Sequence, residues 1–354
     1  MSSPMPDRST FDPRAFRPAW WLRSAHAQTI GSKFLRPDPH IPLSRERIET
    51  PDGDFLDLDF GPTPRDDAPI GLVLHGLEGS ARRRYALLTY HALLAAGIRP
   101  VGLNFRSCSG EPNRTARFYH SGETGDLGFI LGHLAERFPG IPKGVIGFSL
   151  GGNVLLKLLG EAPERASEWV QAAVAISVPF DLAEGARRLE RSPMGRLYTA
   201  YFLRSLRRKI RAKAALLEGR CDLASVLRAR TLRAFDDAVT APLHGFRDAA
   251  DYYRQSSAVR FLQHIRVPTL LLHAEDDPFL PAHALPHDAV AQNPHLVAAF
   301  TPRGGHVGFI TGRWPWAPRF WAESEAARFL RVRLGSTASR RPAAGSGRHG
   351  GSGA

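Results

Sequence analysis

The chain has 354 residues, enough to bury a large core in one α/β domain with an insertion, or in two domains. Hydrophobic residues make up 43% and charged residues 23% of the sequence, which is ordinary for a soluble globular protein. No apolar run approaches the ~20 residues that span a bilayer. The first residues also lack the apolar segment of a secretory signal, so we expect a cytoplasmic protein. The two cysteines, Cys108 and Cys221, are too few for a disulfide framework.

The formal net charge of +13 raises the possibility of a nucleic-acid or membrane partner. Only five of the 47 basic residues are lysines, and this skew, together with many Ala, Gly and Pro residues, is typical of translation from a GC-rich genome. Net charge bears on solubility and non-specific association rather than on fold. We therefore expect no nucleic-acid partner.

Short apolar runs alternate with segments of helical periodicity along most of the chain. Continuous apolar runs are typical of strands buried on both faces of a parallel sheet. The expected strands are 45–50, 54–60, 69–75, 99–105, 144–148, 171–178, 267–274 and 295–301, and the main expected helices are 85–96, 126–138, 150–159 and 316–332. This alternation predicts an α/β fold with a mostly parallel, doubly wound sheet of about eight strands.

The second expected strand carries a different pattern from the others. Apolar residues alternate in it with Asp57 and Asp59, so we expect one face of this strand to be in contact with water.

Residues 181–257 interrupt the alternation and indicate several consecutive helices. Fourteen Arg or Lys residues and only three acidic residues lie between Arg187 and Arg233, interleaved with apolar side chains. We interpret this segment as a helical cap inserted over the strand ends, between core segments 19–180 and 258–334. Its basic residues form either a solvated helix face or a peripheral contact with a membrane surface.

The two ends of the chain differ in composition from the rest. Residues 1–18 are polar and contain proline, and residues 335–354 are of low complexity and rich in Gly, Ser and Arg. We expect a flexible N-terminus and a disordered tail.

The segment from Gly147 to Gly151 has the pattern G-x-S-x-G, with an apolar strand before it and a helix after it. In this context the pattern is typical of a nucleophile elbow, in which a serine occupies a strained turn between small neighbours. Ser149 would then lie at the N-terminus of a helix, where free N–H groups favour developing negative charge. The alternative is a glycine-rich loop with a capping serine.

A serine hydroxyl needs a base and an orienting acid to act as a nucleophile. The fold places the acid after a late strand and the histidine after the last strand. His306, in a glycine-rich turn, fits the base. Asp276 and Asp277 both fit the acid; we favour Asp277 because it directly precedes Pro278, and expect Asp276 to cap the turn.

An oxyanion hole requires two N–H donors that face the developing charge. We expect these to be the backbone groups of Leu150, just after the nucleophile, and of Leu77, in the loop after the first buried strand. Further candidate substrate contacts, with less support from the sequence, are Gly76, Phe148, His120 and Phe279.

The sequence offers little for a metal or a cofactor. His283, His287 and His295 are clustered, but no obvious third ligand accompanies His283 and His287. No cysteine pair has zinc spacing, and no nucleotide-binding glycine fingerprint follows the first buried strand. We expect neither a metal nor a cofactor.

Several motifs together resemble one family over roughly residues 16–333, the YheT-like branch of the α/β-hydrolase superfamily. This is the AB hydrolase-4 family, which includes the eukaryotic ABHD1/2/3-type lipases. The matching segments are Trp21–Arg23 with His26 and Gln28–Thr29, His75–Ser80, Phe105–Asn113, Tyr119–Thr124, Gly151–Asn153, Phe235–Asp237, Asp251–Arg254, His273–Phe279 and Gly304–Phe309. The resemblance implies a Ser-His-Asp carboxylesterase or acylglycerol lipase, with these roles on Ser149, His306 and Asp277.

Three functional hypotheses follow from the sequence. The first is a serine hydrolase that cleaves short-chain or lipid-type carboxylic esters, including monoacylglycerols, through an acyl-enzyme. The second is an acyltransferase or thioesterase that uses the same three residues. The third belongs to another class: a protein that binds membranes or anions through its basic cap and carries a vestigial triad.

Overall fold

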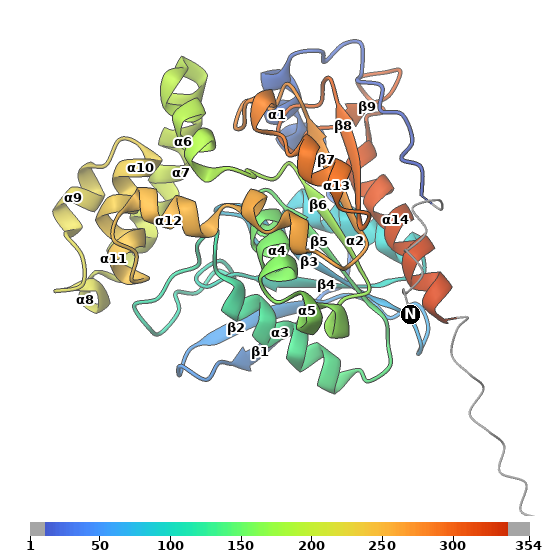
Figure 1. Cartoon of the computed structure of the whole chain (residues 1–354), viewed down its shortest axis with the longest axis horizontal. Helices are drawn as coiled ribbons and strands as arrows, with labels where there is room; N and C mark the ends of the chain where they lie inside the picture. The colour runs from blue at the N-terminus through green and yellow to red at the C-terminus, as the bar shows by residue number, and fades with distance from the viewer. Residues whose placement is uncertain (1–10, 339–354) are drawn as a thin grey trace, which may run out of the picture.

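The computed structural model describes residues 11–338, which form an eight-stranded sheet between layers of helices (Figure 1). The strand order is β1-β2-β4-β3-β5-β6-β7-β8. The strands are β1 (Ser44–Glu49), β2 (Phe55–Phe60), β3 (Ile70–Leu74), β4 (Arg99–Asn104), β5 (Lys143–Phe148), β6 (Ala172–Ile176), β7 (Thr269–Ala274) and β8 (Leu296–Thr301). Strand β2 is antiparallel to β1 and β4, and all pairings from β4 to β8 are parallel. The predicted mostly parallel sheet is confirmed.

Helices cover both faces of the sheet and account for most of the remaining regular structure. A small hairpin of β9 (Ile310–Thr311) and β10 (Arg319–Phe320) lies before the last helix. The α-helices are α1 (Ala25–Leu35), α2 (Arg84–Ala95), α3 (Thr124–Arg137), α4 (Leu150–Glu161), α5 (Pro163–Trp169), α6 (Leu182–Arg191), α7 (Pro193–Ala212), α8 (Ala214–Leu217), α9 (Leu223–Arg228), α10 (Leu232–Phe235), α11 (Ala241–Leu243), α12 (Ala249–Ser256), α13 (His287–Gln292) and α14 (Trp321–Ala338).

The central strands are buried on both faces because helices pack on each side. In β3, Leu72 belongs to the core cluster shared with α3 and α4, whereas the next residue, Val73, belongs to the cluster shared with α2 and α14. Successive side chains of a strand point to opposite faces, so a two-sided core requires an unbroken apolar run. Each such side chain stabilises the fold by roughly 1.5–3 kcal/mol relative to exposure.

The segment between β6 and β7 is helical, as the interrupted pattern predicted, and it gathers on one side of the sheet (Figure 1). Local capping fixes its first helices. The Asp181 side chain accepts the Glu184 N–H at 3.0 Å before α6, and Ser192 followed by Pro193 starts α7. Helix α7 is amphipathic, and Leu203 and Ile210 on it contribute to a separate hydrophobic cluster.

The expectation that β2 has a wet face is wrong. All six residues of β2 are buried, including both aspartates. Arg47 of β1 pairs with Asp57 at 2.8 Å, and Arg45 and Arg82 pair with Asp59 at 2.8 and 2.7 Å. The alternating pattern therefore reflects a face covered by arginine side chains rather than by water, because buried carboxylates require paired charges.

The described parts of the two chain ends are more ordered than the sequence predicts. Phe11 is buried against Phe329 of α14, with ring centroids 4.8 Å apart, and the Arg14 N–H donates to Glu325 at 2.9 Å. Residues 11–18 therefore pack on the body, and α14 continues to Ala338, beyond the predicted start of the tail at residue 335. Residues 1–10 and 339–354 lie outside the described part of the chain. Within residues 11–338, no helix has both the length and the hydrophobicity to cross a bilayer.

We predict that Gly147→Ala destabilises the fold by roughly 3 kcal/mol. A Cβ at this position would lie 2.6 Å from the Gly151 carbonyl oxygen and from the Gly152 Cα, which are backbone atoms that cannot rotate away. The measurement is the urea midpoint of unfolding. Gly335→Ala, on an open surface of α14, is the matched control and should stabilise by about 0.5–1 kcal/mol. An unchanged midpoint for Gly147→Ala would contradict the packing described.

Candidate active site

The site is built on the sharp turn between β5 and α4. Ser149 occupies it with φ 51° and ψ −117°, a backbone conformation that is costly for a residue with a Cβ. Helix α4 starts so close to β3 that a Cβ on Gly151 would lie 2.6 Å from the His75 carbonyl oxygen. Leu150 is the first residue of this helix, so its N–H has no partner within the helix. The turn therefore has the tight geometry predicted for a nucleophile elbow, in which the residues beside the serine must be glycines.

Three side chains from distant parts of the chain form a continuous hydrogen-bonded row. His306 Nε2 lies 2.9 Å from Ser149 Oγ, and His306 Nδ1 lies 2.8 Å from Asp277 Oδ2. An ionised carboxylate only accepts, so Nδ1 carries the ring proton and Nε2 accepts from the serine. The other oxygen, Asp277 Oδ1, accepts the Phe279 N–H at 2.7 Å. Burial acts to raise the pKa of Asp277, but the interaction with His306 outweighs it and holds the pKa below its ordinary value.

The two adjacent aspartates have different partners. Asp276 accepts the Gly305 N–H at 2.8 Å and thereby fixes the glycine turn before His306, as expected of a capping residue. Thr29 of α1 holds the same turn, because its hydroxyl accepts the His306 N–H at 2.9 Å. The structure therefore brings Asp277, and not Asp276, to the imidazole ring.

The loop after β3 leaves one N–H group near the serine without an acceptor. The Gly76 N–H donates to Tyr85 Oη at 3.1 Å, and the Glu78 N–H donates to Tyr119 Oη at 2.8 Å. Between them, the Leu77 N–H has no acceptor within residues 11–338. Leu77 and Leu150 both line the cavity in which Ser149 lies. The arrangement leaves the two expected oxyanion donors available.

A buried ion pair joins this loop to the cap, and the sequence analysis did not anticipate it. Glu78 has a left-handed backbone (φ 56°), and its carboxylate accepts from Tyr119 Oη at 2.8 Å and from Lys209 Nζ at 2.7 Å. Ser205, one turn before Lys209 on α7, donates to the same carboxylate. In the sequence, only the acidic residue of the His75–Ser80 motif indicated a contact here, because its two partners in the cap are more than a hundred residues away along the chain.

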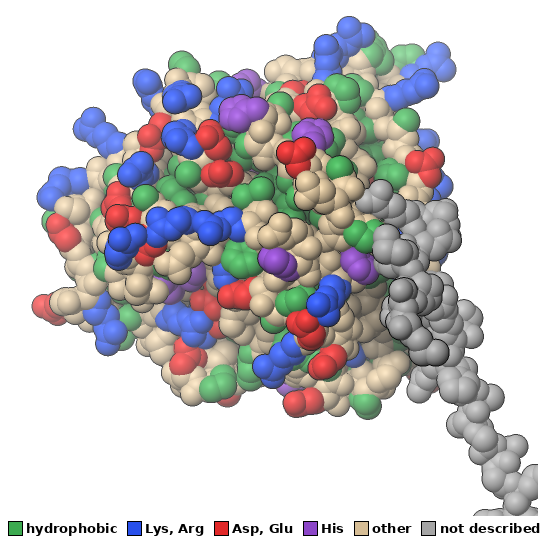
Figure 2. Space-filling model, viewed as in Figure 1, with side chains coloured by type: hydrophobic (Ala, Val, Ile, Leu, Met, Phe, Trp, Pro, Cys, Tyr) green, Lys and Arg blue, Asp and Glu red, His purple; other side chains and the backbone are tan. Residues whose placement is uncertain are grey.

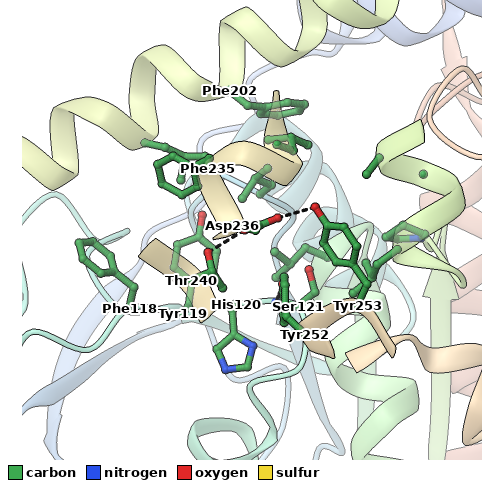
Figure 3. Close-up of a pocket in the computed structure, with 18 of the residues that line it drawn as sticks. Phe118, Tyr119, His120, Ser121, Phe202, Phe235, Asp236, Thr240, Tyr252 and Tyr253 are labelled. Atoms are coloured by element: carbon green, nitrogen blue, oxygen red, sulfur yellow. Dashed lines mark hydrogen bonds between the residues drawn. The ribbon is translucent and has the colours of Figure 1, made fainter. Parts of the chain in front are cut away.

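The serine and the histidine face a largely apolar cavity that the core and the cap enclose together. The empty space inside the cavity and in the open solvent at its mouth amounts to about 1130 Å³. Phe118 to Ser121, from the long loop before α3, form one wall, and Phe202 and Phe235 of the cap form another (Figure 3). A cavity with this lining suits an apolar ligand group.

The four residues that the sequence indicated with less support as substrate contacts do not all lie at the cavity. Phe279 lines the cavity and stacks on the His306 ring at 4.1 Å, and His120 also lines the cavity. Gly76 lies against the serine, because a Cβ there would be 3.1 Å from Ser149 Cβ. Phe148 does not line the cavity. It is buried against Tyr85, on the face of the sheet covered by α2, because the strand alternation turns it away from the site.

Asp236 is the one acidic side chain among the described residues that line the cavity. Asp236 accepts from Tyr253 Oη at 2.8 Å and from Thr240 Oγ1 at 2.6 Å (Figure 3). Burial raises the pKa of Asp236 to about 6, although the two hydrogen bonds act in the opposite direction. The cavity wall therefore gains a negative charge as the pH rises through about 6.

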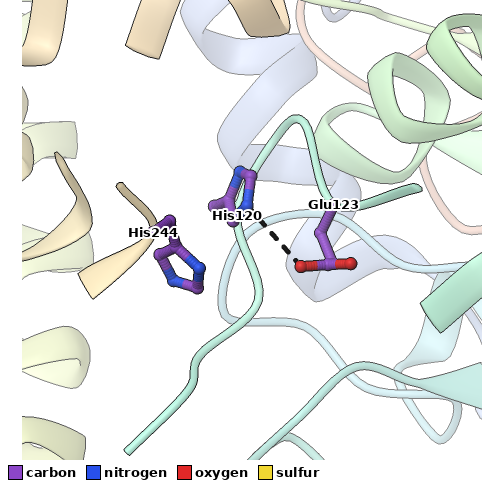
Figure 4. Close-up of side chains that lie close together, drawn as sticks. All are labelled: His120, Glu123 and His244. Atoms are coloured by element: carbon purple, nitrogen blue, oxygen red, sulfur yellow. Dashed lines mark ion pairs between the residues drawn. The ribbon is translucent and has the colours of Figure 1, made fainter. Parts of the chain in front are cut away.

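A second polar cluster consists of His120, Glu123 and His244 (Figure 4), and its two histidines also line the cavity. Its potential ligand atoms all lie within 4.8 Å of one another, and the cap supplies only His244. Sequence spacing did not reveal the cluster because this histidine is distant along the chain. Burial lowers the pKa of His120 to about 3 and of His244 to about 4, so both rings are neutral at pH 7.

The carboxylate of this cluster also belongs to an ion-pair network. Arg117 Nη2 lies 2.7 Å from the Glu123 carboxylate, and Arg117 also pairs with Asp52 and Asp126. The cluster lies between the cap, which supplies His244, and the long loop, which supplies His120 and Glu123, and we expect it to pack these two parts together.

Comparisons with known proteins agree with this fold. Residues 72–313 match the family model described as the alpha/beta hydrolase fold. YheT of Escherichia coli is 39% identical over 323 residues, which cover 90% of this chain and 94% of that protein. The phospholipase ABHD3 of Mus musculus is 32% identical over 85% of this chain and 74% of its own length.

A solved esterase structure from Pyrococcus furiosus superposes with a TM-score of 0.53 at 17% identity, covering 91% of this chain and 98% of that one, which is evidence for the fold alone. The fold, the elbow and the relatives define the class of protein. The chain belongs to the α/β-hydrolase family, in the branch that contains YheT and ABHD3.

We predict that Asp236→Asn stabilises the protein more at neutral than at acidic pH. The folded-state pKa of about 6 lies above the unfolded value of 3.8, so the native state of the wild type loses stability as pH rises between these two values. The substitution should remove this loss, and its effect on the unfolding free energy should grow by roughly 2 kcal/mol between about pH 4.5 and about pH 7.5. Urea unfolding of both proteins at the two pH values measures it. A pH-independent difference would contradict the raised pKa.

Proposed function

We propose that this protein is a serine hydrolase that cleaves carboxylic esters of small molecules or lipids through an acyl-enzyme on Ser149. The observation that carries the proposal is the hydrogen-bonded row from Asp277 through His306 to Ser149, which opens on an apolar cavity. A complete nucleophile, base and orienting acid at the wall of a pocket is the arrangement that acyl transfer requires.

In the first step, Ser149 Oγ attacks the ester carbonyl carbon while His306 Nε2 accepts the hydroxyl proton. Asp277 holds the Nδ1 proton and stabilises the imidazolium that forms. The carbonyl oxygen becomes an oxyanion, which accepts hydrogen bonds from the N–H groups of Leu77 and Leu150. The tetrahedral intermediate then collapses, and His306 returns the proton to the departing alcohol, which leaves the acyl group on Ser149.

In the second step, a water molecule takes the place of the alcohol. His306 accepts a proton from this water as its oxygen attacks the acyl carbonyl carbon, and the same N–H groups stabilise the second oxyanion. Collapse of this intermediate releases the carboxylic acid and returns the proton to Ser149 Oγ. Each cycle consumes one ester and one water and produces one acid and one alcohol.

The cavity lining supports an apolar acyl group rather than a charged one. Phe202, Leu206 and Ile210 lie at spacings of four residues along α7 and line the cavity from the cap side. The name of the relative ABHD3 designates a phospholipase, and its similarity supports lipid esters as substrates. We extend the proposal to lipid-type esters, including monoacylglycerols.

Ser149→Ala should lower ester hydrolysis by a factor on the order of 10^4 or more, because the remaining groups have no nucleophile to activate. The measurement is the hydrolysis of p-nitrophenyl butyrate together with labelling by a fluorophosphonate probe, which should be lost in parallel. Adding an alcohol acceptor to the wild type separates hydrolysis from acyl transfer. Ester hydrolysis at the wild-type rate in Ser149→Ala would overturn the proposal.

The neighbouring aspartates provide a matched pair of variants. Asp277→Asn should lower kcat by about 10^4, because an amide cannot stabilise the imidazolium and favours the wrong ring tautomer. Asp276→Asn retains an oxygen acceptor for the Gly305 N–H and should cost less than about tenfold. The reverse order of the two effects would assign the acid to Asp276.

A further inference from the structure

Most of the exposed large apolar side chains in the described part of the chain lie on three segments: the stretch that leads into and forms α1, the first half of α7, and the segment after β9. We call these residues the aromatic face; they are Trp20, Ile30, Phe34, Leu197, Tyr201, Trp314 and Trp316. Leu216 is also exposed but does not belong to it. Phe34 and Trp316 are 69% and 77% exposed, a poor arrangement in water for side chains of this size unless another surface covers them.

Helices α1 and α7 supply one half of the aromatic face. Ile30 and Phe34 are four residues apart on α1, and Leu197 and Tyr201 are four residues apart on α7, so each pair shares one face of its helix. Lys33, between the first two, donates to Tyr201 Oη at 2.8 Å and lies 4.3 Å from the centre of its ring. This contact makes the two apolar pairs neighbours.

The three tryptophans supply the other half, beside the start of α1. The indole N–H of Trp20 donates to the Arg313 carbonyl oxygen at 2.9 Å, which joins the segment before α1 to the segment after β9. In that second segment, the rings of Trp314 and Trp316 stack with centroids 5.2 Å apart. Leu22, two residues after Trp20, packs on α1, because a Cβ at Gly31 would lie 3.2 Å from its side chain. The two halves of the aromatic face therefore belong to segments that pack together.

The charges on the segments that carry the aromatic face have one sign. Segments 19–36, 192–208 and 311–320 contain Lys and Arg but no Asp or Glu. Blue Lys and Arg side chains project along the upper edge of the molecule in Figure 2. The exposed cations of the three segments include Arg23, Lys33, Arg196, Arg204, Arg208 and Arg313. Tryptophan and tyrosine favour the headgroup region of a bilayer, and clustered Lys and Arg attract anionic lipids, so this combination matches an anionic membrane surface.

The helix that carries part of the aromatic face also forms a wall of the candidate active site. Leu197 and Tyr201 point outward from α7, whereas Phe202 and Leu206 of the same helix line the cavity. Tyr198, between the exposed pair, lies 4.9 Å from the ring of Phe279, which stacks on His306. A bilayer against the aromatic face would lie one helix away from the catalytic histidine.

We propose that the aromatic face docks this protein on anionic lipid bilayers, so that lipid esters reach the cavity from the membrane. The docking itself depends only on the surface described, and the delivery of substrate rests on the proposed function. The apolar side chains enter the interface, and the surrounding cations contact the lipid phosphates. The protein binds peripherally through exposed side chains of α1, α7 and the 313–316 segment.

The test is co-sedimentation of the full chain, as Ser149→Ala, with vesicles of phosphatidylcholine alone or mixed with phosphatidylglycerol. Binding should require the anionic lipid and weaken at high salt. The double variant Phe34→Ser/Trp316→Ser should lower the partition coefficient about tenfold or more by removing apolar insertion. Arg204→Glu/Arg313→Glu should lower it by at least about tenfold through the lost charge contacts.

Matched controls separate the surface from general effects of substitution. Leu216→Ser removes an exposed leucine outside the aromatic face, and Arg165→Glu reverses an exposed charge on α5, which lies on the lower side of the molecule in Figure 1, whereas α1 lies at the top. Both should bind vesicles like the parent. Circular dichroism of every variant confirms the fold.

Hydrolysis of p-nitrophenyl butyrate, a substrate that needs no membrane, keeps the two proposals apart. Face variants that lose vesicle binding but retain this hydrolysis, each made in the wild-type background, support docking. Three results would overturn docking. The parent does not bind vesicles, the face variants bind them as well as the parent does, or the protein binds a DNA duplex more tightly than vesicles at the same salt concentration. None of these results affects the proposed hydrolase. Conversely, normal vesicle binding without any ester hydrolysis by the wild type would overturn the hydrolase alone.

Discussion

The geometry of the site depends on the strained turn at Ser149. The backbone reaches φ 51° there only because β5, α4 and the loop after β3 approach each other at distances that exclude side chains at Gly147, Gly151 and Gly152. Strain of about 1–3 kcal/mol persists when the surrounding packing over-determines it. In return, the hydroxyl projects from the sheet edge beside the free N–H groups at the start of α4. The other residues of the site are arranged around this hydroxyl.

Helix α7 links three features that are separate in the sequence. Phe202 and Leu206 line the cavity, Lys209 pairs with Glu78 in the oxyanion loop, and Tyr201 belongs to the exposed aromatic face. The pair of Lys209 and Glu78 is largely buried, so loss of one partner would leave an uncompensated charge. A shift of this helix would therefore change the cavity and the oxyanion loop together.

The large positive charge has two structural explanations. Some arginines are internal: Arg106 is buried and pairs with Asp54 and Asp126 at 3.0 and 2.7 Å, and Arg36 pairs with Glu323 at 2.8 Å. These residues are compensated and do not contribute to the surface. Part of the exposed positive charge lies on segments without acidic residues, above all on α7. Some of the basic residues therefore stabilise the fold, and others form this surface.

The sequence by itself determined the order of strands and helices, the elbow, and the positions of the serine and the histidine along the chain, and it narrowed the acid to two adjacent aspartates, because local periodicity and turn chemistry specify these features. Only the tertiary structure decided between Asp276 and Asp277, turned Phe148 into the core, and covered Asp57 and Asp59 with arginines. These outcomes depend on which side chains meet across the sheet and between distant segments. A one-residue step reverses the direction of a side chain in a strand, and sequence periodicity does not identify the partner that it meets.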